Sequence, residues 1–310
     1  MPRPTAPARR LVRPFSTTRN LGRTSPVHLH LPSKWPHYIT YENAAQIQAV
    51  VREEALRIKA SSRRGSPVAP TVLSFTPTPT YTLGRRQKSL SDEQRRGLTK
   101  PLAVAASRAD WDPHGTFDPA IRFFTPHVTH SDRGGLTTYH GPGQIVLWPV
   151  VDLHSSEYPH LAVRDYARLL EETTRAVLDA EFGIKTYFKT DEPGVWVVPD
   201  GTHTQERKIA AMGIHLRRHV SGLGVAINVD MPIMGDAMVN PWARFVPCGL
   251  EGKAVTSIAA EMGSRWKHLP LESIDGAELA STWTLEFLER LGVDPEAYEE
   301  EEEEAARQLH

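Results

Sequence analysis

The sequence contains one cysteine among its 310 residues, Cys248, and no long hydrophobic run. A single thiol excludes an internal disulfide and any zinc or iron–sulfur site built from several cysteines. The longest apolar run, Ile145 to Val151, has seven residues and includes Pro149, whereas a membrane-spanning helix needs about 20. The histidines, such as His154, His160, His215 and His219, are scattered along the chain, and their spacing does not suggest a metal site. We therefore predict no membrane segment and no metal site.

An excess of basic residues is also missing. The chain has 36 Lys and Arg against 37 Asp and Glu, a formal net charge of −1. A general nucleic-acid binder needs positive charge to displace counterions, so we predict no nucleic-acid partner. Hydrophobic residues make up 40% and charged residues 24%, which is enough apolar surface to build a core and excludes a disordered or fibrous chain.

The two ends of the chain differ in charge from the middle. No acidic residue precedes Glu42, and six arginines lie among Ser, Thr and Pro in the first 23 residues. This composition is typical of a mitochondrial transit peptide, although a disordered basic arm would share it. We predict a transit peptide within 1–26, cleaved beyond about Phe15, and a mitochondrial location. The uninterrupted run Glu299 to Glu304 predicts a disordered acidic tail over 293–310.

Helix and strand patterns interleave between these ends without a strict rhythm. Helical spacing of apolar residues predicts helices over 42–60, 163–182 and 277–291. Apolar and β-branched runs predict strands over 71–75, 144–151, 194–198, 208–220 and 222–229, the last two joined by a turn near Ser221. Residues 85–126 lack such periodicity and predict a long surface insertion. The fold class predicted is α/β (α+β), a mixed β-sheet flanked by helices.

A glycine-rich loop from Arg133 to Gln144 is the densest motif: RGGLTTYHGPGQ. Paired glycines let backbone approach a ligand closely, and Arg133 has the chemistry to hold an anionic or carbonyl group. A hairpin turn with a satisfied His140 would show some of the same features. Four glycines with an arginine, a tyrosine and a histidine in twelve residues favour a binding loop.

Cys248 and Lys208 are the candidates for catalysis. A thiolate is a strong nucleophile, and it needs a nearby cation because an unperturbed thiol is mostly protonated at neutral pH. Lys208 opens a largely apolar strand and would favour the thiolate and move protons if it points into the same site. By themselves the residues also fit a blander interpretation, a small buried thiol and a solvated lysine at a strand end.

Together these segments resemble the lipoyl(octanoyl) transferase family, the octanoyl-[acyl carrier protein]:protein octanoyltransferases. The resemblance spans Tyr41 to about Ile258, in the family's order. It includes Tyr41–Gln48, Thr80–Arg85, the Arg133–Gln144 loop, Lys208–Gly213, Gly224–Val229 and Pro247-Cys248-Gly249. It implies a mitochondrial member of the fungal type. It also implies a catalytic domain over 27–292 with the fold of biotin and lipoate protein ligases.

The resemblance also implies roles for individual residues. Cys248 matches the acyl-thioester nucleophile, and Lys208 matches the lysine that lowers its pKa. The residues implied to contact substrate are Arg133, Gly134, Gly135, Leu136, Thr137, Thr138, Tyr139, His140, Ala211, Met212, Gly213, Gly224, Val225 and Ala226. One position departs from the pattern, because Leu223 stands where the family commonly has histidine.

The reaction implied is octanoyl transfer from octanoyl-acyl carrier protein to a lysine of lipoyl domains, without cofactor or ATP. The acceptors implied are the E2 subunits of 2-oxoacid dehydrogenases and the glycine cleavage H protein. Because carrier proteins are acidic, we expect a basic docking rim that includes Arg85, Arg86, Lys88, Arg217 and Arg218. The alternatives are an ATP-dependent lipoate or biotin ligase, which would not need Cys248, and a non-catalytic lipoyl-domain binding protein.

Overall fold

The computed structural model describes residues 25–33, 35–61, 67–87, 89–106, 121–199, 205–245, 253–270, 275–294 and 299–302, the last for its backbone alone. The structural statements below concern these residues. Cys248 and nearly all of the predicted transit peptide lie outside them, so both predictions stay predictions.

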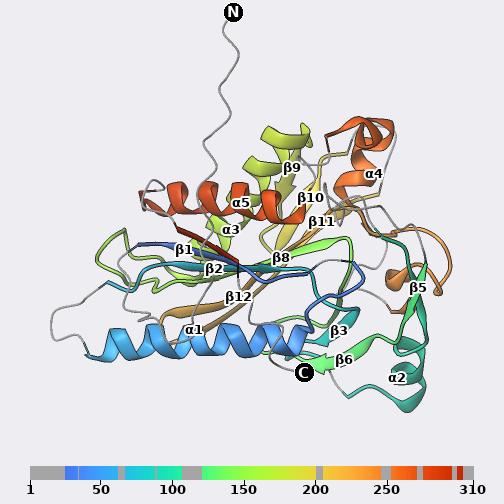
Figure 1. Ribbon diagram of the computed structural model, residues 1–310, viewed down its shortest axis with the longest axis horizontal. Coiled ribbons are helices and arrows are strands. Elements are labelled where there is room, and N and C mark those ends of the chain that lie inside the picture. The colour runs from blue at the N-terminus through green and yellow to red at the C-terminus, as the bar shows by residue number, and fades with distance from the viewer. Residues whose placement is uncertain are drawn as a thin grey trace, which may run out of the picture.

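A mixed sheet of nine strands forms the centre of the molecule (Figure 1). Its order is β14-β1-β2-β8-β12-β11-β10-β9, and β13 pairs with β11. The strands are β1 Val27–His30, β2 Thr71–Phe75, β8 Gln144–Val150, β9 Thr186–Phe188, β10 Gly194–Val197, β11 Arg207–Arg217, β12 Val220–Asn228, β13 Ala254–Val255 and β14 Glu299–Glu302. The pairs β14–β1, β1–β2 and β11–β13 are parallel, and the others are antiparallel. This confirms the predicted mixed sheet.

Helices cover both faces of this sheet (Figure 1). Helix α1 (Tyr41–Ser61) packs on one face, and α3 (Val163–Phe182) and α5 (Gly276–Leu291) pack on the other. Side chains of a strand alternate between faces, and β8 shows this clearly. Val146 and Trp148 are buried under α1, whereas Ile145 and Leu147 are buried under α3 and α5. Two apolar cores therefore share one central strand.

The predicted helices agree with the structure to within one residue at each end. Their sequence signals are local, because apolar stripes at helical spacing bury one face and leave the other in water. Helices α3 and α5 both end at a glycine, Gly183 with φ 67° and Gly292 with φ 84°. Only glycine takes this left-handed conformation without a steric penalty.

Smaller elements lie at one side of the central sheet, on the right in Figure 1 where β3 and β6 are labelled. Strands β6 (His127–His130), β3 (Thr80–Leu83) and β7 (Thr137–His140) form a second sheet in that order. The chain also forms two 3-10 helices, η2 (Pro241–Arg244) and η3 (Gly263–His268), and the short helix α4 (Ile258–Met262).

The predicted surface insertion over 85–126 is partly wrong. It contains α2 (Asp92–Leu98) and the paired strands β4 (Leu102–Val104) and β5 (Arg122–Phe124). Leu98, Leu102 and Val104 are buried in a third apolar cluster with Tyr81, Tyr139 and Met231. A signal was available, because Ser91 and Gln94 form the reciprocal capping box that starts α2. Residues 107–120 lie outside the described part.

The turn between β11 and β12 lies three residues before the predicted position near Ser221. Arg218 (φ 51°) and His219 (φ 69°) form a two-residue turn. Such hairpins need positive φ at both central positions, where Gly, Asn and Asp are the usual residues. None of these three residue types stands at the turn, so sequence analysis could not locate it. Ser221 itself belongs to β12.

Part of the predicted disordered tail is ordered. Glu299–Glu302 form β14, which runs parallel to β1 with Val27 opposite Glu299. A β1 without this neighbour would be an edge strand with unpaired backbone groups, and backbone pairing does not require apolar side chains. Charge repulsion among the glutamates therefore does not prevent this pairing.

Candidate active site

A cleft lies at the junction of β11 and β12 with β7, β8 and the start of α1; we call it the main cleft. Its lining is mostly apolar, with a few polar groups. The lining residues are Tyr41, Arg133, Thr138, His140, Trp148, Lys208, Ala211, Met212, Gly213, Leu223, Gly224, Val225, Ala226, Asn228, Trp242 and Val255. Lys208, Ala211–Gly213 and Gly224–Ala226 were all predicted, and the structure brings them together here.

At two positions in the wall of the cleft, neighbouring atoms lie so close that a side chain larger than that of glycine would not fit. A Cβ added to Gly224 would lie 2.1 Å from the carbonyl oxygen of Leu147 on β8. A Cβ on Gly213 would lie 2.9 Å from the aliphatic stem of Arg133. Neither distance allows a side chain without moving the neighbour, so glycine at these positions lets the strands and Arg133 close the wall.

Arg133 contacts protein with its guanidinium. It is buried and donates from Nη2 to Thr82 O at 2.7 Å and from Nη1 to Gly134 O at 3.0 Å. It also donates to the Thr82 hydroxyl. We predicted that Arg133 would hold a ligand at the mouth of the site. The structure shows the guanidinium fixing the glycine-rich loop to β3, and the side chain also lines the cleft, so the ligand contact stays a prediction.

His140 is a neutral member of a hydrogen-bonded chain. Its Nδ1 donates to Gln144 Oε1 at 2.8 Å, Gln144 Nε2 donates to Asn228 Oδ1, and Asn228 Nδ2 donates to Thr256 O. Burial lowers the pKa of His140 to about 4, against the opposing effect of the Gln144 hydrogen bond. At neutral pH the ring is therefore uncharged, with Nδ1 protonated and a lone pair on Nε2. This histidine is held through Nδ1 and also lines the cleft.

The contiguous segment predicted from Arg133 to His140 is divided by strand alternation. Thr138 and His140 line the cleft, whereas Thr137 donates to Gln87 and Tyr139 is buried against Tyr81. Gly134, Gly135 and Leu136 are absent from the lining. Their carbonyl oxygens lie close to Gly84, where an added Cβ would be 2.6 Å from Gly135 O. These residues shape the loop behind the cleft.

Sequence analysis missed several lining residues. Tyr41, at the start of α1, stacks on the His140 ring with centroids 5.4 Å apart, and Trp148 meets Tyr41 edge-on at 5.2 Å. Burial raises the pKa of Tyr41. The segment Tyr41–Gln48 was part of the family resemblance, so this signal existed for Tyr41. Nothing in the local sequence pointed to Trp148 or Trp242.

The Lys208 ammonium group lies over the face of a tryptophan ring, and the lysine lines the main cleft. Its Nζ lies 5.0 Å from the ring centroid of the fully buried Trp196, which is opposite Lys208 on β10. A Cβ on Gly194 would lie 2.4 Å from Lys208 Cε, so this glycine leaves room for the lysine stem. A cation over an aromatic face is attracted to the ring quadrupole. The ring and the glycine together fix the direction of the lysine.

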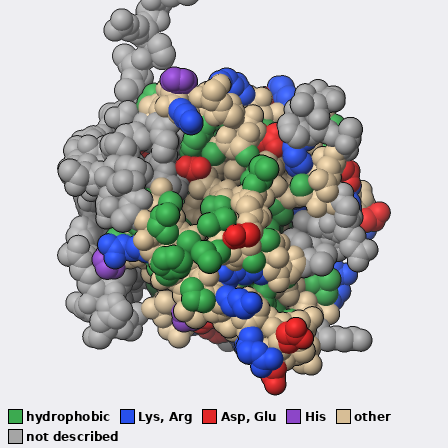
Figure 2. Space-filling view, turned by 90° about the vertical axis from the view of Figure 1, so that its right-hand side faces the viewer, with side chains coloured by type: hydrophobic (Ala, Val, Ile, Leu, Met, Phe, Trp, Pro, Cys, Tyr) green, Lys and Arg blue, Asp and Glu red, His purple; other side chains and the backbone are tan. Residues whose placement is uncertain are grey.

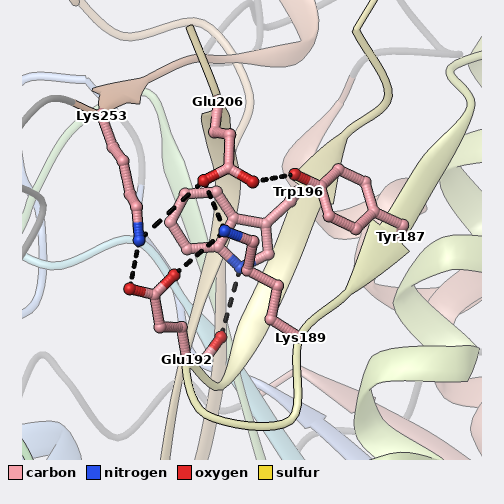
Figure 3. Close-up of polar contacts among 6 residues, drawn as sticks. All are labelled: Tyr187, Lys189, Glu192, Trp196, Glu206 and Lys253. Carbon is pink, nitrogen blue, oxygen red and sulfur yellow. Dashed lines mark hydrogen bonds and ion pairs between the residues drawn. The ribbon is translucent and has the colours of Figure 1, made fainter.

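Two other lysines face the same ring but are paired with carboxylates (Figure 3). Glu206 contacts Lys189 and accepts from the Tyr187 hydroxyl, and Glu192 contacts Lys253. The hydrogen bonds from these lysines lower the pKa of both carboxyls. Neither Lys189 nor Lys253 lines the main cleft, which distinguishes them from Lys208.

Cys248 lies outside the described residues, but the chain on both sides of it can be followed. Before it, Trp242 lines the cleft and the Phe245 ring contacts Tyr81. After it, Val255 lines the cleft and is opposite Lys208 in the β11–β13 pair. The cysteine therefore belongs to a segment whose two flanking stretches both reach the main cleft.

The same end of the molecule presents an apolar surface. Figure 2 shows hydrophobic side chains gathered on the face turned to the viewer, the right-hand side of Figure 1, where β5 is labelled. On β5 and the 231–245 segment, Phe123, Met234 and Met238 are more than half exposed. Exposed apolar groups in one area are typical of contact surfaces. In the described part of the chain, no helix is long and apolar enough to cross a membrane, and no acidic, His or Cys cluster is arranged to hold a metal.

Comparison with known proteins connects this geometry to a family. The model of the lipoyl protein ligase A/B catalytic domain matches residues 121–280, about half of the chain and most of the cleft-lining residues. The chain belongs to this family. The solved structure of P. falciparum LipL1 in complex with lipoate covers 89% of this chain and 65% of its own, with a TM-score of 0.51 and 10% identity. At that identity the likeness concerns the fold, and it confirms the predicted lipoate-ligase-like architecture.

Within the family, the similar curated proteins are octanoyltransferases, which are acyltransferases. One from Cellvibrio japonicus is 42% identical over 131 residues, covering 42% of this chain and 53% of that protein. A probable octanoyltransferase from Schizosaccharomyces pombe is 33% identical over 230 residues, covering 74% of this chain and 85% of that protein. The match thus spans about half of the bacterial relative and most of the fungal one.

Proposed function

We propose that the protein transfers an octanoyl group from octanoyl-acyl carrier protein to a lysine of lipoyl domains, through a thioester on Cys248. The observation that carries the proposal is a lysine, Lys208, held at an apolar cleft by Trp196 and Gly194. The choice of octanoyl as the acyl group follows from the similar curated proteins, which are octanoyltransferases. An eight-carbon chain suits walls such as Met212, Val225 and Trp148 because burying it removes apolar surface from water.

In the first half-reaction the Cys248 thiolate attacks the thioester carbonyl. A bond forms between the cysteine sulfur and the acyl carbon, and the bond to the carrier thiol breaks. Lys208, as an ammonium ion, gives the departing thiolate its proton. The products are octanoyl-Cys248, the free carrier thiol and a neutral Lys208. No ATP is consumed, because the incoming thioester is already activated.

The second half-reaction restores the enzyme. A neutral lysine amine of the acceptor attacks octanoyl-Cys248, an amide forms, and Cys248 leaves as a thiolate. Neutral Lys208 takes the proton that the attacking amine loses, which returns it to the ammonium form. One lysine therefore serves as acid in the first step and base in the second, and its charge favours the Cys248 thiolate between turnovers.

The proposed protein partners are acidic carrier protein as donor and, as acceptors, the lipoyl domains of 2-oxoacid dehydrogenase E2 subunits and the glycine cleavage H protein. Of the basic rim expected at the docking face, Arg85, Arg86, Arg217 and Arg218 are exposed, and Arg217 contacts Glu53. Lys88 lies outside the described residues. Exposed apolar side chains on β5 and on the segment that contributes Trp242 to the cleft, such as Phe123 and Met238, offer further contact area.

Intact-mass measurement tests the proposal. The full chain is mixed with octanoyl-acyl carrier protein, without ATP and without acceptor, and a mass gain of one octanoyl group on Cys248 is expected. Cys248→Ala should give no adduct, because the chain has no other thiol. Adding a lipoyl domain should discharge the adduct. Octanoylation of the lipoyl domain only when ATP and free octanoate are supplied would instead indicate a ligase.

We further propose that the protein is imported into mitochondria, with the Arg-rich, acid-free segment within 1–26 as its transit peptide. The composition of that segment supports import, and a fungal relative is consistent with a eukaryotic member. Expression of a C-terminally tagged chain, followed by fractionation and N-terminal sequencing, tests this. An uncut cytosolic protein would contradict it.

A further inference from the structure

A buried carboxylate, Glu171, lies on the side of α3 that faces the central sheet. The residue is only 5% exposed. Acidic side chains are almost never fully buried without partners, because taking a charge out of water is costly unless other groups compensate for it. Glu171 was not predicted as a functional residue, and neither half-reaction uses it. Its partners therefore indicate what it does.

Two groups hold this carboxylate in place. The backbone N–H of Gly194, the first residue of β10, donates to Glu171 Oε1 at 3.1 Å. Arg168 Nη1, one turn earlier on α3, lies 3.7 Å from Oε2. Burial raises the pKa of the Glu171 carboxyl, while the Gly194 hydrogen bond and nearby cations, Lys208 among them, lower it. Because an electrostatic interaction acts on both partners, the carboxylate in turn favours the ammonium form of Lys208.

Gly194 is the residue at which Glu171 and Lys208 meet. Its φ of 128° is a conformation that residues with a side chain rarely adopt. A Cβ at this position would lie 2.4 Å from Lys208 Cε and 3.1 Å from Nζ, so the end of the lysine lies directly against the glycine. The strand pairing shifts just after it, between Val195 and Trp196, which places Trp196 opposite Lys208. The hydrogen bond from Gly194 to Glu171 therefore holds the backbone against which the lysine lies.

The other charged groups around Lys208 and Glu171 come from several elements. They are Arg168 and Arg175 on α3, Lys189 and Glu192 between β9 and β10, Glu206 just before β11, and Lys253 just before β13. The two carboxylates among them contact lysines over the Trp196 ring (Figure 3). Their side chains are 32% and 33% exposed, against 7% for Glu171. Water therefore screens them more strongly, and Glu171 is the buried carboxylate of this group.

We propose that Glu171 is a positioning residue for Lys208 and that it acts through Gly194. By accepting from the glycine N–H, it keeps the start of β10 in the conformation that leaves the ammonium group over Trp196 at the cleft. Glu171 itself does not line the main cleft. The inference rests on the proposed function, in which Lys208 transfers protons in both half-reactions. Loss of Glu171 should therefore slow the chemical steps and leave substrate binding unchanged.

Two variants of Glu171 test this role. Glu171→Leu removes the acceptor and should slow acylation of Cys248 at saturating donor by about 10- to 100-fold. The KM values for donor and lipoyl domain should stay within about two-fold of wild type, because the cleft lining is unchanged. Glu171→Gln keeps an acceptor for Gly194 and should recover most of the rate. Because it removes the negative charge, the fall in rate at high pH, where Lys208 loses its proton, should begin at lower pH than in wild type.

The decisive measurement combines Glu171→Leu with Lys208→Met. If Glu171 acts through Lys208, the double variant should acylate no more slowly than Lys208→Met alone, because the group that Glu171 positions is already absent. A further loss by the full Glu171→Leu factor would overturn the inference. A wild-type rate in Glu171→Leu would also overturn it, as would equal losses in Glu171→Leu and Glu171→Gln.

Gly194→Ala tests the same contact with Glu171 intact, so the inference stays testable if Glu171→Leu does not fold. The added Cβ would press on the lysine and should slow acylation as Glu171→Leu does; an unchanged rate would overturn the inference. Thr173→Val is the matched control, because Thr173 is fully buried on the same helix and donates to Leu169 O within α3. It should keep the wild-type rate and pH dependence.

The wild-type chain separates this inference from the proposed function. If wild type forms no octanoyl adduct with the carrier-protein donor, the proposed function is refuted. If wild type forms the adduct and the rate does not depend on Glu171, only the role of Glu171 is refuted.

Discussion

The main cleft and a second cavity beside it share Tyr41 and Leu223, but their arginines have different partners. We call the second one the cationic cavity; its walls include Gln48, Arg52, Arg85, His130, Asp132 and His215. Arg133, on the wall of the main cleft, is buried and its guanidinium is bonded to Thr82 and Gly134. Arg52, in the cationic cavity, is half-buried and donates to a histidine. Proximity to a cavity therefore does not tell what an arginine does; its hydrogen-bond partners must be known as well.

The largest expected effect concerns the cation of the main cleft. Lys208→Met should slow acylation of Cys248 by roughly 10² to 10⁴, the usual contribution of a positioned acid–base group. Single-turnover mass spectrometry measures the rate, and the pH dependence of iodoacetamide alkylation should shift to higher pH because the thiolate loses a nearby cation.

Lys189→Met is the control for that change, since Lys189 faces the same Trp196 ring at a similar distance but does not line the main cleft. It should leave acylation within a few-fold of wild type. Similar losses in both variants would show that the tryptophan cluster, and not Lys208 itself, supports the reaction.

The second prediction concerns how the free energy of unfolding depends on pH through the neutral His140 of the main cleft. Its pKa of about 4 lies below the roughly 6.5 of an unfolded chain. The unfolded state therefore binds the proton more readily. The free energy of unfolding keeps this contribution above pH 6.5 and loses it as the pH falls toward 4, by about 3 kcal/mol in total. Urea unfolding at pH 7.5, 6 and 5 measures the slope.

His140→Gln should flatten that slope between pH 6.5 and 4, whereas His160→Gln, at an exposed histidine, should keep it. A wild-type slope in the His140 variant would mean that another group titrates there, and the assignment of a neutral, buried His140 would be wrong.

The third prediction compares the two arginines directly by stability. Arg133→Gln should lower the free energy of unfolding by about 2–4 kcal/mol, because it leaves the buried Thr82 carbonyl without its charged donor. Arg52→Gln should cost less than about 1 kcal/mol, since the side chain is only half-buried. Urea titrations of the two variants under one set of conditions give the difference. Equal losses would show that the two arginines do not differ in their contribution to the stability of the fold.

The smallest expected effect comes from joining the two spaces. Leu223→Gly should change the free energy of unfolding by less than about 1 kcal/mol, because relief of the positive φ offsets the loss of a partly buried side chain. With the wall removed, discrimination between octanoyl and decanoyl donors should fall a few-fold. Steady-state kcat/KM for the two donors measures this, and unchanged selectivity would show that Leu223 does not bound the acyl space.

Much of this molecule followed from local sequence patterns. Apolar stripes at helical spacing predicted α1, α3 and α5, and an apolar run predicted β8; the structure confirms all four. These patterns are local, because a buried face requires apolar residues at a fixed spacing. The resemblance to the octanoyltransferase family pointed to the glycines at 213 and 224 and to the lysine at 208, and all three line the main cleft. The hairpin turn at Arg218 was misplaced, because its residues carry no turn signal.

Other features depended on how distant segments meet. The stack of Tyr41 on His140 joins residues far apart in the sequence, and the cationic cavity combines α1, β3, β6 and β11. The order of strands in a sheet is set by long-range pairing, which no local spacing encodes. The sequence by itself determined which side chains had the chemistry for acyl transfer. Only the tertiary structure decided which hydrogen-bond partners each arginine has and which cavity it lines, because that depends on contacts between segments that local patterns do not specify.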